Sequence, residues 1–313
     1  MVDNPPLTLL GSFSALIVVG ALALAGPLAT DGDHPGFLHA LFLSASAVTV
    51  TGLASFDIGE LSLFGELVVL LLIQVGGFGI MTMGTVIGLV TARRLGVTRR
   101  VLARAEIGAI EFGEVRALVK SILGITLLVE VIGGLLLALA IVGAHDRSLI
   151  GGLYEGFFLS ISAFNNAGIT IQPDGMAAFR GDVAIIGVTS AAIILGGLGF
   201  PVIIELARRV RPARWTLHTK VVILASAGLF AIAPLVVAAF EWTNPDTLGP
   251  LGTGEKALNA WFQGVSPRTA GFNTVDVGAM NEPTLLVVMA LMFIGAGPAA
   301  TSSETITPTW TWL

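Results

Sequence analysis

Long apolar runs, separated by short polar stretches, dominate the chain. Six of them approach the ~20 residues that a helix needs to cross the hydrocarbon core of a bilayer. These predicted spans cover residues 7–29, 60–92, 117–143, 182–207, 217–241 and 281–296. Three apolar stretches of only about four helical turns lie at residues 36–49, 150–165 and 254–267. Each follows an odd-numbered span and precedes an even-numbered one. The pattern therefore predicts a repeated unit of span, re-entrant or interfacial short helix, and span.

The three predicted short helices lead into one kind of glycine-centred loop. Each copy ends in a small residue, a glycine and an apolar residue, within residues 46–53, 162–169 and 266–272. An aspartate follows each glycine five or six positions later, and a second glycine cluster lies 24, 28 and 24 residues after it. A repeat of about a hundred residues indicates an architecture built from copies of one unit.

The composition places the chain in the membrane. It is 54% hydrophobic and 12% charged, with a mean hydropathy of +0.89, whereas soluble domains carry about 25% charged residues. We therefore expect an all-α integral membrane protein. The chain has no cysteine and four scattered histidines, so it offers no thiolate metal site and no metal-ligand spacing. The sequence contains no catalytic set either, and we expect neither an enzyme nor a bound cofactor.

The basic residues predict the topology. Of the 16 lysines and arginines, seven lie within residues 93–120 and five within residues 208–220. By the positive-inside rule both loops are cytoplasmic, in a multi-pass protein of the plasma membrane. Both follow even-numbered spans, so the short helices and their loops face the outside. A nucleic-acid patch would use the same residues, but both clusters adjoin long apolar runs, and we expect the lipid bilayer and no nucleic acid as a partner.

The glycine-centred loops have the chemistry of an ion filter. Non-helical backbone is tolerated at membrane depth only where it lines a cavity or packs in protein. Glycine adopts the backbone angles that aim successive carbonyls at one axis, and rings of carbonyls replace the water shell of a dehydrated cation. The short helix also directs its negative C-terminal end at the same axis. The predicted ion-contacting residues are Val50, Thr51, Gly52, Asn166, Ala167, Gly168, Thr269, Ala270 and Gly271.

Polar residues beside these loops have two interpretations each. Asp57, Asp174 and Asp276 follow the three loop glycines and could form a charged ring at the outer mouth, where acidic groups concentrate cations. The alternative is that they cap their own loops. Asn165 and Asn166 could satisfy the bent backbone rather than contact the ion.

Two charges lie at membrane depth. Arg268 precedes a loop glycine by three residues, and membrane-buried arginines are usually paired or functional. We expect a structural ion pair behind the filter with an outer acid, with a gating role as the alternative. Glu130 is isolated within the third span. It either pairs with a neighbouring span or marks an ion or proton path.

The loops and the glycine clusters resemble a known family. The segments that carry the resemblance are residues 48–53, 163–168, 268–274, 76–79 and 196–201. The first three resemble the first three filter sequences of the Trk/Ktr/HKT superfamily of potassium transporters, and the last two its inner-helix signatures. The resemblance implies four span–pore–span repeats around one axis, with filter glycines at Gly52, Gly168 and Gly271. It also implies potassium over sodium, a homodimer, and a cytoplasmic nucleotide-binding regulatory subunit.

The resemblance runs from about residue 8 to residue 298 and covers three repeats. Residues 293–298 fit the entry into the broken inner helix of that family, which gives Gly295 and Gly297 a structural or gating role. The glycine run and the lysine expected next are missing, as is a fourth repeat. We therefore expect a truncated or frame-disrupted copy whose tail after Pro298 is unrelated, with a separately encoded fourth repeat as the alternative.

These observations divide the chain into five segments. They are repeat A at 1–92, a cytoplasmic basic loop at 93–116, repeat B at 117–210, repeat C at 211–298 and a divergent tail at 299–313. The function that we expect is the pore-forming subunit of a potassium (monovalent cation) uptake system, in an incomplete copy, with K⁺ as the transported ion. The alternatives are a non-conducting membrane interaction protein and a secondary transporter of another class.

Overall fold

The computed structural model describes residues 5–30, 36–95, 112–145, 147–208, 211–297 and 299–301. In this part of the chain the regular structure is helical, apart from one isolated bridge between Thr30 and Leu61. The α-helices are α1 (Pro5–Leu24), α2 (Phe37–Thr49), α3 (Leu63–Leu95), α4 (Phe112–Ala144), α5 (Leu149–Phe164), α6 (Val183–Gly197), α7 (Phe200–Ala207), α8 (Leu217–Glu241), α9 (Thr253–Val265) and α10 (Glu282–Ile294). The predicted all-α class is confirmed.

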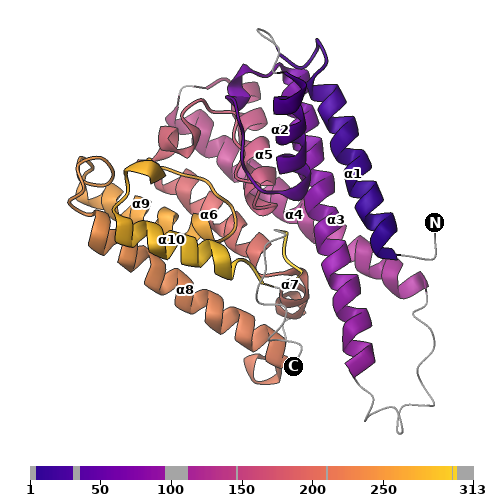
Figure 1. Cartoon of the computed structure of the whole chain (residues 1–313). Helices are drawn as coiled ribbons and strands as arrows, with labels where there is room; N and C mark the ends of the chain where they lie inside the picture. Colours follow the sequence, from indigo (N-terminus) through magenta and orange to yellow (C-terminus); the bar gives the residue numbers. More distant parts are fainter. Residues whose placement is uncertain are drawn as a thin grey trace.

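The helices pack as three consecutive units. In each, the first helix packs most extensively against the short helix that follows it: α1 on α2, α4 on α5, and α8 on α9. In Figure 1 the orange and yellow helices α8, α9 and α10 lie together, and the indigo and purple helices α1, α2 and α3 lie together on the opposite side. Contacts of α3 with α5, and of α6 with α9, join each unit to the next.

Serine and glycine pairs bring the first two short helices close to their spans. Ser44 of α2 donates a 2.7 Å hydrogen bond to the carbonyl of Ile17 in α1, and a Cβ at Gly20 would lie only 2.4 Å from the same hydroxyl. In the second unit Ser160 of α5 makes the equivalent 2.9 Å bond to a carbonyl of α4, beside Gly133. Because both serines are fully buried, these bonds remove polar groups from an apolar interior.

Three helical stretches are long and apolar enough to cross a membrane by themselves: 63–82, 119–144 and 217–241. Helices α6 and α7 pass the same test only together, and they are bent by 104° at their junction. The predicted continuous span over 182–207 is therefore wrong. The helix breaks because Gly199 adopts φ +86°, a value that favours glycine, and because Pro201 lies in the first turn of a new helix, where proline is favoured.

The break in α6–α7 is bonded to the chain that follows α10. The N–H of Gly297 donates to the carbonyl of Gly197 at 2.8 Å, and the N–H of Phe200 donates to the carbonyl of Ala299 at 3.1 Å. Helix α10 itself stops at Ile294, two residues short of the predicted span. These bonds satisfy backbone groups that the two helix ends leave free, which an apolar environment requires.

Parts of the predicted loops and tail fall outside the described residues. The basic loop at 93–116 is described only at its two ends, since residues 96–111 are excluded, and residues 302–313 of the predicted tail are excluded as well. In the second basic loop, Pro212 opens a short 3₁₀ turn, η4 (Pro212–Arg214).

Candidate ion filter

The three predicted filter glycines share one backbone conformation. Gly52, Gly168 and Gly271 have φ angles of +83°, +66° and +79°. Residues with a side chain rarely adopt such values. Each of these glycines lies a few residues after the end of a short helix, α2, α5 or α9, so the three loops leave their helices in similar ways.

Three serines hold the loops in this shape. Ser46, Ser162 and Ser266 lie near the ends of the three short helices. The carbonyl of each accepts the N–H of the residue just before the filter glycine, at 2.8, 2.8 and 2.9 Å. The hydroxyl of each bonds the backbone just after that glycine: it accepts an N–H at 2.8 and 3.1 Å in the first two loops, and donates to a carbonyl at 2.7 Å in the third. Sequence reasoning assigned these serines no role, although each opens its copy of the repeat.

Carbonyl oxygens of the second and third loops converge beside the first. A Cβ placed on Gly52 would lie 2.5 Å from the carbonyl oxygen of Ala167 and 3.3 Å from that of Ala270. A Cβ on Gly168 would lie 2.1 Å from the Ala270 oxygen. The structure thus brings the three predicted loops into mutual contact. The corresponding direction at Gly271 meets no described atom within 4 Å.

The third loop differs from the first two at its entry. Val50 and Asn166, two residues before the filter glycine, adopt left-handed φ angles of +56° and +58°. The equivalent Thr269 has φ −145°. A left-handed valine is uncommon because its side chain is β-branched. Such strained residues cluster at functional sites, which fits the predicted filter role of these positions.

The second glycine clusters let the following helices approach the ends of the short helices. A Cβ on Gly76 of α3 would lie 2.1 Å from the carbonyl oxygen of Val48, and one on Gly196 of α6 would lie 1.9 Å from that of Phe164. Val48 and Phe164 both precede their filter glycine by four residues. In the third unit, a Cβ placed on Gly297 would lie 2.6 Å from the carbonyl oxygen of Leu198, at the α6–α7 break. All three glycines therefore serve close packing.

Arg268 is buried behind the third loop without the outer acid that we expected. Its side chain is 4% exposed. Nε donates to the carbonyl of Gly295 at 2.6 Å, Nη1 donates to the hydroxyl of Ser226 at 2.9 Å, and the guanidinium lies 5.2 Å from the ring centre of Phe230. No carboxylate among the described residues pairs with it. A carbonyl, a hydroxyl and the face of an aromatic ring thus surround this cation.

Glu130 supports the second loop through amide groups. The residue is 3% exposed. Oε1 accepts a 3.0 Å bond from the amide of Asn165, and Oε2 accepts a 3.2 Å bond from the amide of Gln74. Asn165 caps α5 immediately before the filter residues. Of the two interpretations of Glu130, the structure therefore favours pairing with neighbouring elements, here α3 and the end of α5.

Asn166 connects the second loop to the third. Its Oδ1 accepts a 2.7 Å bond from the hydroxyl of Thr269. Its Nδ2 donates to the carbonyl of Phe164 at 3.2 Å and to the hydroxyl of Thr301 at 2.6 Å. The bond to Phe164 agrees with the interpretation that this asparagine satisfies bent backbone. Its link to Thr301 had no sequence signal, because 135 residues separate the two.

Two of the three outer aspartates cap short turns. Asp57 accepts the N–H of Gly59 at 2.8 Å and precedes η1 (Ile58–Glu60), and Asp276 accepts the N–H of Gly278 at 2.8 Å and precedes η6 (Val277–Ala279). Asp174 precedes η3 (Gly175–Phe179) without such a bond. The capping alternative therefore describes the contacts of the first two, while all three keep the same place after their loops.

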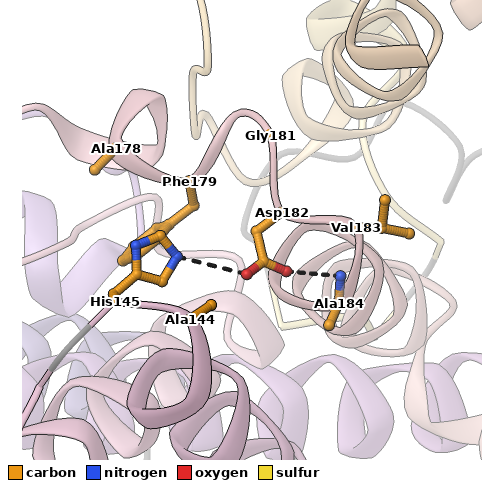
Figure 2. Close-up of a pocket in the computed structure, with 8 residues that line it drawn as sticks. All are labelled: Ala144, His145, Ala178, Phe179, Gly181, Asp182, Val183 and Ala184. Atoms are coloured by element: carbon orange, nitrogen blue, oxygen red, sulfur yellow. Dashed lines mark hydrogen bonds and ion pairs between the residues drawn. The ribbon is translucent and has the colours of Figure 1, made fainter.

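A separate cavity lies at the end of α4 beside the start of α6. Its volume is about 510 Å³, and its lining includes His145, Phe179 and Asp182. Figure 2 shows His145 facing Asp182, with Nε2 and Oδ2 3.5 Å apart, while the other oxygen of Asp182 accepts the N–H of Ala184. The described residues contain no group of three metal-ligating acidic, histidine or cysteine side chains. None of the predicted filter residues lines this cavity.

Comparison with known proteins places this geometry in a family. Residues 13–306 match the family described as TrkH, cation transport protein. The Ktr system potassium uptake protein B of Bacillus subtilis (strain 168) is 39% identical over 301 residues, which cover 96% of this chain and 67% of the relative. The protein of the same name from Vibrio alginolyticus is 34% identical over 98% of this chain and 70% of its own length.

A solved structure shares the fold. The potassium transporter TrkH from Vibrio parahaemolyticus aligns with a TM-score of 0.71 at 20% identity, over 94% of this chain and 56% of that one. The chain thus spans about two thirds of the length of the two curated relatives and little more than half of this structure. The family match runs to residue 306 and so includes residues 299–306 of the segment that sequence analysis set apart as a tail. The chain belongs to the TrkH family of cation transport proteins.

Proposed function

We propose that this chain supplies pore-forming repeats of a potassium uptake system. The observation that carries the proposal is the convergence of the Ala167 and Ala270 carbonyl oxygens beside Gly52. Carbonyl oxygens held around one point can replace the hydration shell of a monovalent cation. The three left-handed glycines allow the loops to come this close, and the buried serine bonds fix them.

Transport on this proposal requires no covalent step. An inside-negative membrane potential supplies about 2.3 kcal/mol per charge for each 100 mV, which drives cations inward. Asp57, Asp174 and Asp276 follow the loops at the mouth, where negative charge raises the local cation concentration. Glycine at position 52, rather than a residue with a polar side chain, accords with a preference for potassium over sodium.

Orientation and partners belong to the same proposal. The two basic loops face the cytoplasm of a plasma-membrane protein, as the positive-inside rule indicates. The relatives are named as proteins of a Ktr system, which supports assembly with other subunits. We propose a homodimer, with a cytoplasmic nucleotide-binding regulatory subunit on the side of the basic loops.

Rubidium uptake tests the proposal. The 313-residue chain and its variants Gly52→Ala and Gly143→Ala are expressed in cells stripped of their own potassium uptake systems, and insertion is checked in isolated membranes. Gly143 lies in α4 with nothing within 4 Å of a Cβ, so Gly143→Ala is the matched control. We expect saturable uptake by the parent chain and the control, and a loss of about tenfold or more in Gly52→Ala, whose methyl group would displace a coordinating carbonyl.

The contrary result is equally clear. A parent chain that inserts normally but takes up no rubidium would show that these repeats do not conduct by themselves, and would favour a non-conducting membrane interaction protein. If Gly52→Ala leaves uptake unchanged, the loops do not form the ion filter.

A further inference from the structure

The chain just after α10 is packed into the core of the second unit. Ala300 is 2% exposed and Thr301 is fully buried. The N–H of Thr301 donates to the carbonyl of Gly196 at 3.3 Å. Together with the bonds of Gly297 and Ala299 to the α6–α7 break, this contact seats the segment along the broken helix.

The hydroxyl of Thr301 reaches the second filter loop. It accepts a 2.6 Å bond from the amide of Asn166. The amide nitrogen donates its other hydrogen to the carbonyl of Phe164, and the amide oxygen accepts a hydrogen bond from the hydroxyl of Thr269. A side-chain amide has two N–H donors, so both donors of Asn166 are used. The amide therefore joins the second loop, the third loop and the chain after α10.

Asn166 directly precedes Ala167, whose carbonyl oxygen is one of the two that converge beside Gly52. Asn166 is left-handed, at φ +58°, and the next residue, Ala167, places its carbonyl oxygen beside Gly52. A turn of the Asn166 backbone would move that oxygen directly. Binding groups need to be held within about 0.5 Å of their productive geometry, so whatever fixes Asn166 also fixes the site.

We propose that Thr301 is a positioning residue of the filter. Through Asn166 it couples the filter loops to the seating of Gly297 and residues 299–301, so that a potassium ion in the filter and the seated residues stabilise each other. This inference rests on the proposed function, because it assumes that the loops bind potassium. Coupling of this kind is reciprocal: if the segment stabilises the ion site, the ion stabilises the segment to the same extent.

Cysteine labelling tests the coupling. The chain has no native cysteine, so Ala300→Cys introduces a single thiol at a buried position. Membranes that contain the full chain with Ala300→Cys are treated with a thiol reagent in potassium chloride or in choline chloride of equal ionic strength. We expect labelling about fivefold slower in potassium, at the lower end of typical coupling. Adding Thr301→Val should abolish that protection, and Thr301→Ser, which keeps the hydroxyl, should retain it.

Thr284→Val separates the specific effect from general loosening. Thr284, near the start of α10, is also fully buried. Its hydroxyl, however, donates to the carboxylate of Glu241 and not to a filter residue. With Ala300→Cys it should leave the potassium protection intact. Potassium protection that is absent in the parent, or that survives Thr301→Val, would overturn the inference.

Failure of the inference and failure of the proposed function can be told apart. Labelling reports the seating of residue 300 and needs no transport, whereas rubidium uptake reports conduction alone. A chain that shows potassium protection sensitive to Thr301→Val but no uptake keeps the inference and loses the proposed activity. A chain that takes up rubidium but shows no such protection would support the proposed activity and contradict the inference.

Discussion

At the scale of single residues, the candidate filter depends on glycines for two different physical reasons. All three filter glycines have positive φ angles, which cost other residues roughly 1–2 kcal/mol. Gly52 and Gly168 carry a second constraint, because their Cβ direction is occupied by a backbone carbonyl of the next loop, whereas that of Gly271 is open. The sequence motif makes the three equivalent, but the structure makes them unequal.

Substitution by alanine should expose this inequality. Gly168→Ala would place a methyl group 2.1 Å from the Ala270 oxygen, so the backbone must shift and we expect a loss of rubidium uptake of about tenfold or more. Gly271→Ala faces backbone strain alone, and a smaller loss of a few-fold is expected. The check is initial uptake rates of both variants at matched membrane levels. Equal losses would show that the neighbouring carbonyl does not matter.

Arg268 should not tolerate lysine. Its guanidinium serves the Gly295 carbonyl and the Ser226 hydroxyl from two different nitrogens, a geometry that a single ammonium does not reproduce. We expect Arg268→Lys to lower the free energy of unfolding by about 1–3 kcal/mol, because a buried partner loses its hydrogen bond. Arg147→Lys is the control: its side chain is 50% exposed beside Glu155, and exposed pairs contribute little. Thermal unfolding in detergent compares the two.

At the scale of elements, glycines decide where helices approach and where they break. Gly76 and Gly196 admit the carbonyl ends of α2 and α5 against α3 and α6. Gly199, three residues after Gly196, breaks the helix instead, because its φ angle is +86°. The 104° bend between α6 and α7 therefore has a local backbone cause, and the segment after α10 satisfies the groups that it frees.

Two glycines of the same broken span should respond to alanine in opposite directions. Gly199→Ala should lower the free energy of unfolding by about 1–2 kcal/mol, because alanine is strained at that φ angle. Gly187→Ala, in the middle of α6 with nothing within 4 Å of its Cβ, should raise it by up to about 1 kcal/mol through helix propensity. Thermal unfolding of both variants in one detergent measures the difference. Stabilisation by both would contradict the break seen here.

The junction of α3, α4 and α5 should depend on both oxygens of Glu130. Each accepts an amide N–H, from Asn165 and from Gln74. Glu130→Gln replaces one acceptor with an N–H₂ group that faces a donor, so we expect a loss of about 1–3 kcal/mol. Glu282→Gln, at an exposed position, should be neutral. Urea unfolding in mixed micelles would measure the stability of both variants. An unchanged midpoint for Glu130→Gln would exclude a structural role for the carboxyl group.

At the scale of the whole molecule, the sequence predicts most elements and few of their connections. Apolar run length located helices at the predicted spans and at the three short helices, and the repeated glycine motif located the loops, because both signals are local. Among the described residues, however, only 63–82, 119–144 and 217–241 reach membrane-crossing length by themselves. Two sets of contacts join positions far apart in the chain: the bond of Asn166 to Thr301, and the bonds of the α6–α7 break to Gly297 and Ala299. No local pattern encodes them. The break itself does have a local signal, because Gly199 and Pro201 interrupt the apolar run over 182–207.

The orientation of the whole molecule can be tested with single cysteines, since none is native. Ala178 in η3 and Ala213 in η4 are both exposed alanines in short turns, so Ala178→Cys and Ala213→Cys form a matched pair. Because Ala213 lies within the second basic cluster, the positive-inside rule places it in the cytoplasm and Ala178 outside. In intact cells a membrane-impermeant thiol reagent should label Ala178→Cys at once, and Ala213→Cys only after permeabilisation. The reverse labelling order would show that the pore has the opposite orientation, with Asp57, Asp174 and Asp276 at its cytoplasmic end.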